Sequence, residues 1–341
     1  MAIIKLQGEN EKKIGAYYQL DSNDDPIGIG GMGQVYKGVC VNEKTGTTRP
    51  VAIKFMYDDL DTQTIEKGRR EASVQLHNDN LLEMIGFLET EEQNALGSVV
   101  KHYHVISELL EGITLQEIID GNVPETDEDN GFGMSLYNDY RYKRLEFSKR
   151  VIKAVLSGVL AMHDAGYIHR DIDPSNIMLT TDGHIKLIDF GIAKQMTSLT
   201  NNDRSFTTTG KFIGKAKYAA PEQVTGDIAH QNKTTDIYSI GILFYQLVCG
   251  HLPFNGPDHE VMQMQINKSL PLKEIQDKTI RNIIKRATEK NQQKRFQSAS
   301  EFRVALDNPS KSRKAPASFT VIITIMAILG IALGVLLGFL L

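Results

Sequence analysis

Apolar and polar positions alternate over several short segments in the first hundred residues of the chain. This two-residue period is typical of strands, and it predicts strands over residues 34–39, 51–54 and 102–107. The pattern over residues 63–77 is helical, so one helix is expected between the second and third of these strands. Residues 1–16 are mostly polar after a brief apolar start, and we expect them to form a weakly ordered lead-in.

Helical spacing dominates the later part of the chain. Val151, Val155 and Val159 lie four positions apart and predict one apolar helix face that leads to His163. A second apolar helix is expected to begin within residues 236–241. Residues 121–144 are acidic, contain several tyrosines and have no clear period, which is typical of a surface insertion.

Residues 319–341 contain no charged side chain and predict a membrane helix. At about 1.5 Å per residue the segment would be about 34 Å long, enough to span a bilayer core. A buried core helix is the alternative, although a core helix would rarely be apolar on every face at the extreme C-terminus. Lys311, Arg313 and Lys314 precede the segment and no charge follows it, so the positive-inside rule predicts a cytoplasmic domain before a single membrane pass. Residues 307–318 would be the juxtamembrane linker.

Three glycines within this apolar segment share one helix face. Gly330, Gly334 and Gly338 are spaced four apart, a pattern that lets two membrane helices pack closely. This spacing predicts a homodimer, and glycines that merely face lipid are the alternative.

The composition excludes some classes of function. The 341 residues include 38 basic and 42 acidic side chains, and the net charge of -4 gives no general attraction for nucleic acid. Cys40 and Cys249 are far apart in sequence, which favours reduced thiols in the cytoplasm and provides no metal-ligand spacing.

A glycine-rich stretch provides the first candidate for nucleotide chemistry. Gly28, Gly30 and Gly33, followed by Val35, lack the side chains that would keep backbone N–H groups away from phosphate oxygens. A dinucleotide-binding fold could use the same spacing, but it needs a helix that begins among the glycines. Since residues 34–39 alternate like a strand, a hairpin is favoured.

The strongest candidate for catalysis is a carboxylate, Asp171, with an amide five positions later, Asn176, and a second carboxylate, Asp189, beyond a predicted strand pair. These groups can accept a hydroxyl proton and hold magnesium on a nucleotide. Lys54, in a predicted strand, would act on phosphates only if a carboxylate orients it. Glu71 is the best partner, and Glu66 is the second choice.

With these motifs in this order, the chain resembles the eukaryotic-type (Hanks-type) Ser/Thr protein kinases. The Gly-Gly-Met-Gly loop and the apolar segment resemble the bacterial branch of that family. The resemblance covers residues 18–306 and leaves residues 1–17 as the lead-in. It implies an α+β, bilobal protein kinase fold, with a β-rich N-lobe above a mainly helical C-lobe and ATP in the cleft. The implied reaction transfers the γ-phosphoryl group of ATP to a protein Ser or Thr, with Mg2+ as cofactor.

The resemblance also implies individual roles. Asp171 would be the catalytic base, Asn176 and Asp189 would hold Mg2+, and Lys54 would pair with Glu71. Arg170 would receive a phosphate carried by the segment after Gly191, where Thr207, Thr208 and Thr209 are the preferred sites. Glu222 would pair with Arg295, and Asp236 would brace the catalytic loop. The residues implied to contact ATP are Gly28, Gly30, Gly33, Val35, Ala52, Lys54, Ser107, Glu108 and Leu110.

Two positions depart from the family pattern. Asp173 stands where the family has a lysine that reaches the transferred phosphate, and Lys215 stands where it has a threonine. The cation could have moved across this contact, which would make Lys215 a catalytic residue, or the two charges could be unrelated. The departures keep a second class open, a membrane-anchored pseudokinase scaffold. A small-molecule phosphotransferase is disfavoured by the Ala-Pro-Glu motif at residues 220–222. The protein substrates are not indicated by the sequence.

Overall fold

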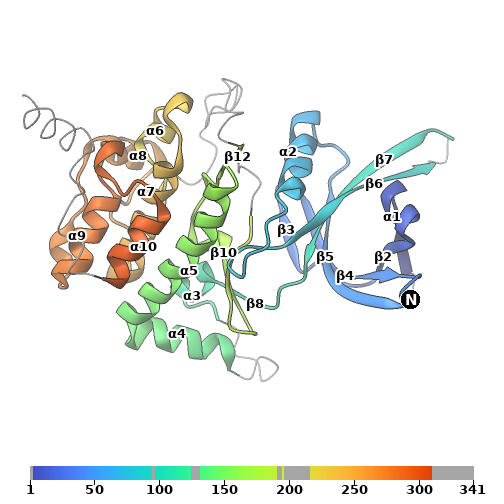
Figure 1. The fold of residues 1–341 in the computed structure, drawn as a ribbon, viewed down its shortest axis with the longest axis horizontal. Helices are drawn as coiled ribbons and strands as arrows, with labels where there is room; N and C mark the ends of the chain where they lie inside the picture. Colours follow the sequence, from blue (N-terminus) through green and yellow to red (C-terminus); the bar gives the residue numbers. More distant parts are fainter. Residues whose placement is uncertain (1–2, 94–96, 124–130, 190–193, 196–215, 309–341) are drawn as a thin grey trace, which may run out of the picture.

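The computed structural model describes residues 3–93, 97–123, 131–189, 194–195 and 216–308, and it shows two lobes (Figure 1). One lobe contains a twisted antiparallel sheet with helix α2 beside it. The other lobe is a group of helices around α5 and α7. The bilobal part of the predicted fold class is therefore confirmed.

Within the described residues, the N-lobe has a seven-stranded antiparallel sheet in the order β1-β2-β4-β5-β7-β6, with β3 paired to β4. The predicted strands over residues 34–39, 51–54 and 102–107 lie inside β4, β5 and β7. The strands are β1 (Ile3–Leu6), β2 (Ala16–Asp21), β3 (Gly28–Gly30), β4 (Gly33–Asn42), β5 (Thr47–Met56), β6 (Met84–Gln93) and β7 (Val99–Glu108).

The expectation of a weakly ordered lead-in is wrong for residues 3–14. Strand β1 pairs with β2 at the sheet edge, and helix α1 (Glu9–Ile14) follows it. Leu6 is buried in the same apolar cluster as Leu88, and a Cβ on Gly8 would lie 2.7 Å from the Leu88 side chain. The segment is ordered by partners on other strands, and a local polar pattern does not reveal such contacts.

Helix α2 (Thr62–Ser73) confirms the predicted helix but ends four residues earlier than residue 77. Its first turn is capped by Asp61, whose side chain accepts a hydrogen bond from the Thr64 N–H at 2.7 Å. Its buried face includes Gly68, Glu71 and Ala72, so Glu71 points toward the protein interior.

The C-lobe contains the two predicted apolar helices. In α5, Val151, Val155 and Val159 are buried, and α7 is buried on nearly every face, as expected for a central helix. The helices are α3 (Leu115–Asp120), α4 (Phe132–Tyr142), α5 (Arg144–Asp164), α6 (Pro221–Val224), α7 (Lys233–Cys249), α8 (Asp258–Asn267), α9 (Lys278–Ala287) and α10 (Ala299–Asp307).

Short strands flank the loop that holds Asp171 and Asn176 in the C-lobe. Strand β10 lies between β11 and β8, and β9 pairs with β12. The strands are β8 (Gly112–Thr114), β9 (Tyr167–Ile168), β10 (Ile177–Thr180), β11 (Ile185–Leu187) and β12 (Lys194–Gln195).

The prediction of a surface insertion over residues 121–144 is wrong for its second half, which forms α4. Tyr140 on α4 is 3% exposed, and its ring packs 5.6 Å from that of Phe147 on α5. The burial of this tyrosine against the next helix stabilises α4, although its polar residues hide the helical period.

Backbone hydrogen bonds join the segment after α2 to strand β11 of the C-lobe. The Leu82 N–H donates to the Leu187 carbonyl at 2.8 Å, and the Leu187 N–H donates to the Asn80 carbonyl at 3.0 Å. On α5, a Cβ at Gly158 would lie only 2.6 Å from the Asn80 carbonyl oxygen. The absence of a side chain at Gly158 allows this backbone to pack directly on the helix.

Within the part of the chain that the structure describes, no helix is both long and apolar enough to cross a membrane. The predicted membrane helix over residues 319–341, with Gly330, Gly334 and Gly338, lies outside the described residues and stays a prediction.

Candidate active site

The loop that carries Asp171 is held from below by a buried carboxylate on α7. Asp236 is fully buried, and it accepts hydrogen bonds from the backbone N–H groups of His169 and Arg170 at 2.9 and 2.8 Å. His163 Nε2 lies 2.8 Å from the same carboxylate. Burial alone would raise the pKa of Asp236, but these partners hold it below its usual value. The loop therefore has a charged, rigid support, as expected for Asp236.

Asp171 and Asn176 are brought together by this loop. Asn176 Nδ2 donates to the Asp171 carbonyl at 2.9 Å and lies 3.3 Å from Asp171 Oδ2. The Asn176 carbonyl in turn accepts from the Ile188 N–H at 3.0 Å, next to Asp189. Asp171, Asn176 and Asp189, which the sequence predicts to act together, thus lie on neighbouring segments joined by hydrogen bonds.

Lys54 and Glu71 meet across the N-lobe. Lys54 Nζ lies 3.4 Å from Glu71 Oε2, so the preferred partner from the sequence is the one present. Burial raises the pKa of the Glu71 carboxyl, Lys54 acts against that rise, and the charge of Asp189 adds to it. Asp189, the magnesium candidate, is thus within electrostatic range of Glu71.

The glycine-rich stretch forms a hairpin and so supports the favoured interpretation over a dinucleotide-binding turn. Gly28 is opposite Val35, and Gly30 is opposite Gly33, in the β3–β4 pair. A Cβ on Gly33 would lie 2.0 Å from the Phe55 carbonyl oxygen, so a larger residue would push β4 away from β5. Val35 is also opposite Lys54, which places the hairpin beside the ion pair.

The connection between the lobes begins at Ser107 and Glu108, at the end of β7. Ser107 is opposite Ala52 on β5. Lys186 Nζ donates to Glu108 Oε1 at 2.6 Å, and the Glu83 N–H donates to the same oxygen at 2.8 Å. The Glu108 side chain therefore links β7 to strand β11, which leads to Asp189. The proposed contacts of Ser107, Glu108 and Leu110 with adenine stay predictions.

Lys186 was not singled out from the sequence. Its side chain is 11% exposed, and it also donates to the Leu81 carbonyl at 3.3 Å. A lysine in a short alternating strand gives no local signal of a buried role, because its partner Glu108 is 78 positions away.

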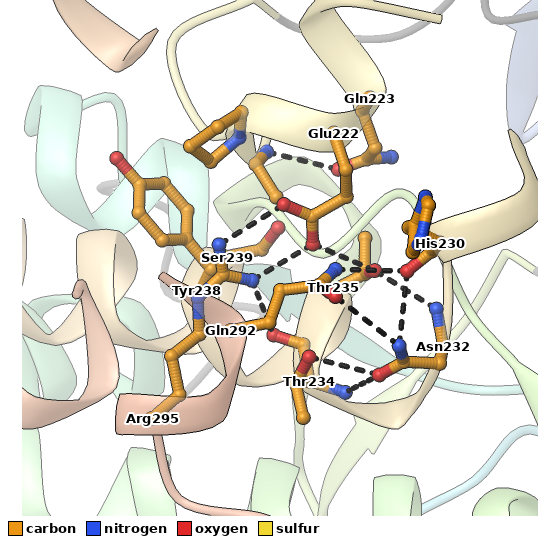
Figure 2. A network of polar contacts seen from close by, with 12 residues as sticks. Glu222, Gln223, His230, Asn232, Thr234, Thr235, Tyr238, Ser239, Gln292 and Arg295 are labelled. Atoms are coloured by element: carbon orange, nitrogen blue, oxygen red, sulfur yellow. Dashed lines mark hydrogen bonds and ion pairs between the residues drawn. The ribbon is translucent and has the colours of Figure 1, made fainter. Parts of the chain in front are cut away.

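A second buried network in the C-lobe links α6, the start of α7 and Arg295 (Figure 2). Arg295 donates to both carboxylate oxygens of Glu222, at 2.7 and 3.0 Å, and to the Thr234 carbonyl at 2.9 Å. Thr235 Oγ1 donates to Glu222 Oε1 at 2.9 Å. The predicted Glu222–Arg295 pair is confirmed, and it is a bidentate ion pair within the protein interior.

Two alternating histidines on β7 have structural partners. His102 Nδ1 lies 2.8 Å from Asp58 Oδ1, and His104 Nε2 lies 3.0 Å from Thr90 Oγ1. Across the described residues there is no cluster of three or more His, Cys, Asp or Glu side chains that could hold a metal by itself.

The chemistry of Asn176 and Asp189 fits magnesium carried by a nucleotide. Magnesium prefers oxygen ligands and is commonly bound by one or two protein groups, with substrate phosphates and water completing the shell. An amide oxygen and a carboxylate provide such ligands. Lys215 and Thr207 to Thr209 lie outside the described residues, so their proposed roles stay predictions.

The fold and these motifs define a protein kinase domain, and comparison with known proteins agrees. Residues 22–305 match the family model described as protein kinase domain, so the chain belongs to this family.

Among curated proteins, the chain is 30% identical over 300 residues to a probable serine/threonine-protein kinase of Clostridium acetobutylicum, covering 84% of the chain and 39% of the relative. It is 33% identical over 234 residues to the serine/threonine-protein kinase PknL of Mycobacterium tuberculosis, covering 67% and 49%. It is 29% identical over 308 residues to the serine/threonine-protein kinase PrkC of Bacillus subtilis, covering 85% and 40%. The matched region thus spans between two fifths and one half of each relative.

Proposed function

We propose that this protein is an ATP- and Mg2+-dependent Ser/Thr protein kinase that phosphorylates hydroxyl groups of proteins. The observation that carries the proposal is the placement of Asp171 against Asn176, with the Lys54–Glu71 pair near Asp189. The similarity to proteins named as Ser/Thr kinases supports the choice of acceptor.

In this mechanism the protein positions its reactants and balances their charge. Asp171 accepts the proton of the substrate hydroxyl, while its backbone is fixed by the loop that Asp236 supports. Lys54 contacts nucleotide phosphates, and Glu71 holds its ammonium group in place. The glycine hairpin offers backbone N–H groups to the phosphates. Asn176 and Asp189 would hold Mg2+, which when bound offsets the negative charge of the phosphates.

A membrane-anchored pseudokinase scaffold is the second candidate, and Asp173 is the observation that favours it. The Asp173 side chain is buried and bonded within its own loop, so position 173 offers no cation to a phosphate. Under the kinase proposal that cation comes from elsewhere, with Lys215 as our candidate.

One experiment separates these functions. The purified full chain is incubated with Mg2+ and ATP, beside Asp171→Asn, and phosphorylated residues are mapped by mass spectrometry. A kinase should label its own hydroxyl residues or an added protein, and Asp171→Asn should be slower by about 10²-fold or more. Equal labelling by both proteins would refute the role of Asp171, and no labelling by the wild type would favour the scaffold.

We also propose that residues 319–341 anchor the chain in the cell membrane as a single-pass helix, with the kinase domain in the cytoplasm. The support is the length and uncharged character of this segment. The full chain should stay in the membrane pellet after alkaline extraction, and a chain ending at Asn308 should be released. If Gly330, Gly334 and Gly338 form a dimer face, Gly334→Ile should reduce self-association in a membrane two-hybrid assay.

A further inference from the structure

Asp173 has a defined place in the loop between Asp171 and Asn176. Its side chain caps the 3₁₀ turn Pro174–Asn176, and the residue is only 1% exposed. Asp173 Oδ1 accepts hydrogen bonds from the Ser175 N–H and from Ser175 Oγ, both at 2.7 Å. This carboxylate therefore fixes the turn that presents Asn176.

The other carboxylate oxygen acts on the Asn176 side chain. Asn176 Nδ2 lies 3.5 Å from Asp173 Oδ2, in addition to its contacts with the carbonyl and carboxylate of Asp171. An amide nitrogen donates, whereas the amide oxygen only accepts. If the amide were reversed, its oxygen would face the acceptor oxygens of both aspartates, and the contacts would become repulsive.

The orientation of the amide decides which atom remains for a cation. With Nδ2 directed at the aspartates, Asn176 Oδ1 is the oxygen that can bind a metal. Ser175 Oγ lies 3.5 Å from Oδ1, but it is much nearer to Asp173 Oδ1, its better acceptor. Hence the hydroxyl proton of Ser175 goes to Asp173 and leaves Oδ1 of Asn176 as a ligand.

We propose that Asp173 is a positioning residue for magnesium, because it orients Asn176 so that the amide oxygen faces the cation. The inference rests on the proposed kinase function for its choice of ligand, Mg2+ carried by a nucleotide. A lysine at position 173 cannot accept the hydrogen bonds from Ser175 and Asn176 that hold this arrangement. Asp173 therefore has a role of its own in the site, even though it cannot contact the transferred phosphate as a lysine would.

The test measures metal binding rather than turnover. The full chain in detergent micelles is titrated with a non-hydrolysable ATP analogue by calorimetry, first in EDTA and then over a range of MgCl2 concentrations. Asp173→Asn keeps the size of the side chain but can direct an amide N–H2 group at Asn176. It should require about 10-fold more Mg2+ for the same gain in nucleotide affinity, since residues behind a metal ligand commonly contribute this much. Its affinity in EDTA should equal that of the wild type.

Asp277→Asn is the matched control, because Asp277 also caps a helix, accepting from the Thr279 and Ile280 N–H groups at the start of α9. It should leave the Mg2+ dependence unchanged. An unchanged Mg2+ dependence in Asp173→Asn, or an equal loss of affinity with and without Mg2+, would overturn the proposal.

If circular dichroism shows that Asp173→Asn does not fold, Ser175→Ala provides the test. It removes the hydroxyl bond to Asp173 and should raise the Mg2+ requirement about two- to three-fold. No change in that variant would also overturn the proposal. If Asp173→Asn raises the Mg2+ requirement but the wild type transfers no phosphate, the kinase activity is refuted and the positioning role of Asp173 remains.

Discussion

The ion pairs of the two lobes differ in how completely the protein surrounds them. In the C-lobe, Arg295 is 0% exposed and bonds both oxygens of Glu222 as well as the Thr234 carbonyl. In the N-lobe, Lys54 approaches Glu71 at 3.4 Å, and its side chain is 22% exposed. The Glu222–Arg295 pair is enclosed by the protein on all sides, whereas the Lys54–Glu71 pair leaves the lysine accessible to a ligand.

The pKa values of the two glutamates agree with this contrast. Burial would raise the pKa of Glu222, but Arg295, together with hydrogen bonds from Gln292 and the backbone, more than offsets this effect, and the net pKa lies below the usual value. Burial raises the pKa of Glu71, and Lys54 does not fully offset that rise. The interactions around Glu222 thus compensate for its burial, whereas those around Glu71 do not, as is common for groups at functional sites.

The largest expected effect is the loss of stability when the C-lobe pair is broken. Arg295→Met leaves the Glu222 carboxylate buried without its cation, which should lower the free energy of unfolding by about 3–5 kcal/mol. Chemical denaturation measures this change. The control is Lys149→Met, which breaks an exposed pair with Glu146 on α5 and should cost about 0.5 kcal/mol or less. Similar costs for both variants would contradict the structural role of Arg295.

For the N-lobe pair, the expected effect on the rate of phosphoryl transfer is large and the effect on stability is small. Lys54→Met should slow phosphoryl transfer by about 10²-fold or more, because the phosphates lose a positioned cation. Its free energy of unfolding should change by only about 1 kcal/mol, since the raised pKa of Glu71 lets this carboxyl take up a proton when the lysine is lost. Initial rates and denaturation curves test the two halves of this statement.

The control for Lys54→Met is Lys37→Met, on the neighbouring strand β4, where the lysine side chain is 55% exposed beside Glu111. It should alter neither rate nor stability. A large loss of stability in Lys54→Met would show that the N-lobe pair is also structural.

The contrast also explains what could be predicted from the sequence. Asp171, Asn176 and Asp189 were found because their chemistry requires these residue types in this order, and the fold then brought them together. Long apolar helices such as α5 were found because many periodic positions agree. The contributions of β1 and Lys186 were missed because each depends on partners far away in sequence. Helix α4 was missed because its polar residues hide the helical period, although it packs on the next helix along the chain. For Asp173, the sequence showed a departure from the family, but only the hydrogen bonds show what the carboxylate does.

A smaller effect is expected where the lobes are joined. Gly158→Ala on α5 introduces a Cβ 2.6 Å from the Asn80 carbonyl oxygen, so the backbone after α2 must move. Overpacking of this kind should cost about 1–3 kcal/mol in the free energy of unfolding. Gly86→Ala in β6 is the control, because no atom lies within 4 Å of the added Cβ. Equal stability of the two variants would mean that the backbone at Asn80 can move away from α5 at little cost in free energy.

The smallest effect concerns a buried histidine in the N-lobe and appears only as the pH changes. Burial lowers the pKa of His104 to about 4, with His102 acting in the same direction and Asp58 against it. The unfolded histidine has a pKa of 6.5, so between pH 6.5 and about 4 the unfolded chain binds more protons than the folded chain. His104 therefore contributes stability that is fully present above pH 6.5 and is lost as the pH falls toward 4. Relative to His104→Gln, the wild type should lose on the order of 1–2 kcal/mol in the free energy of unfolding between pH 7.5 and pH 5.

Denaturation curves at both pH values measure this difference, and His259→Gln, at a side chain 78% exposed, is the control. If the stability difference between wild type and His104→Gln is the same at both pH values, the histidine does not stay neutral in the folded N-lobe.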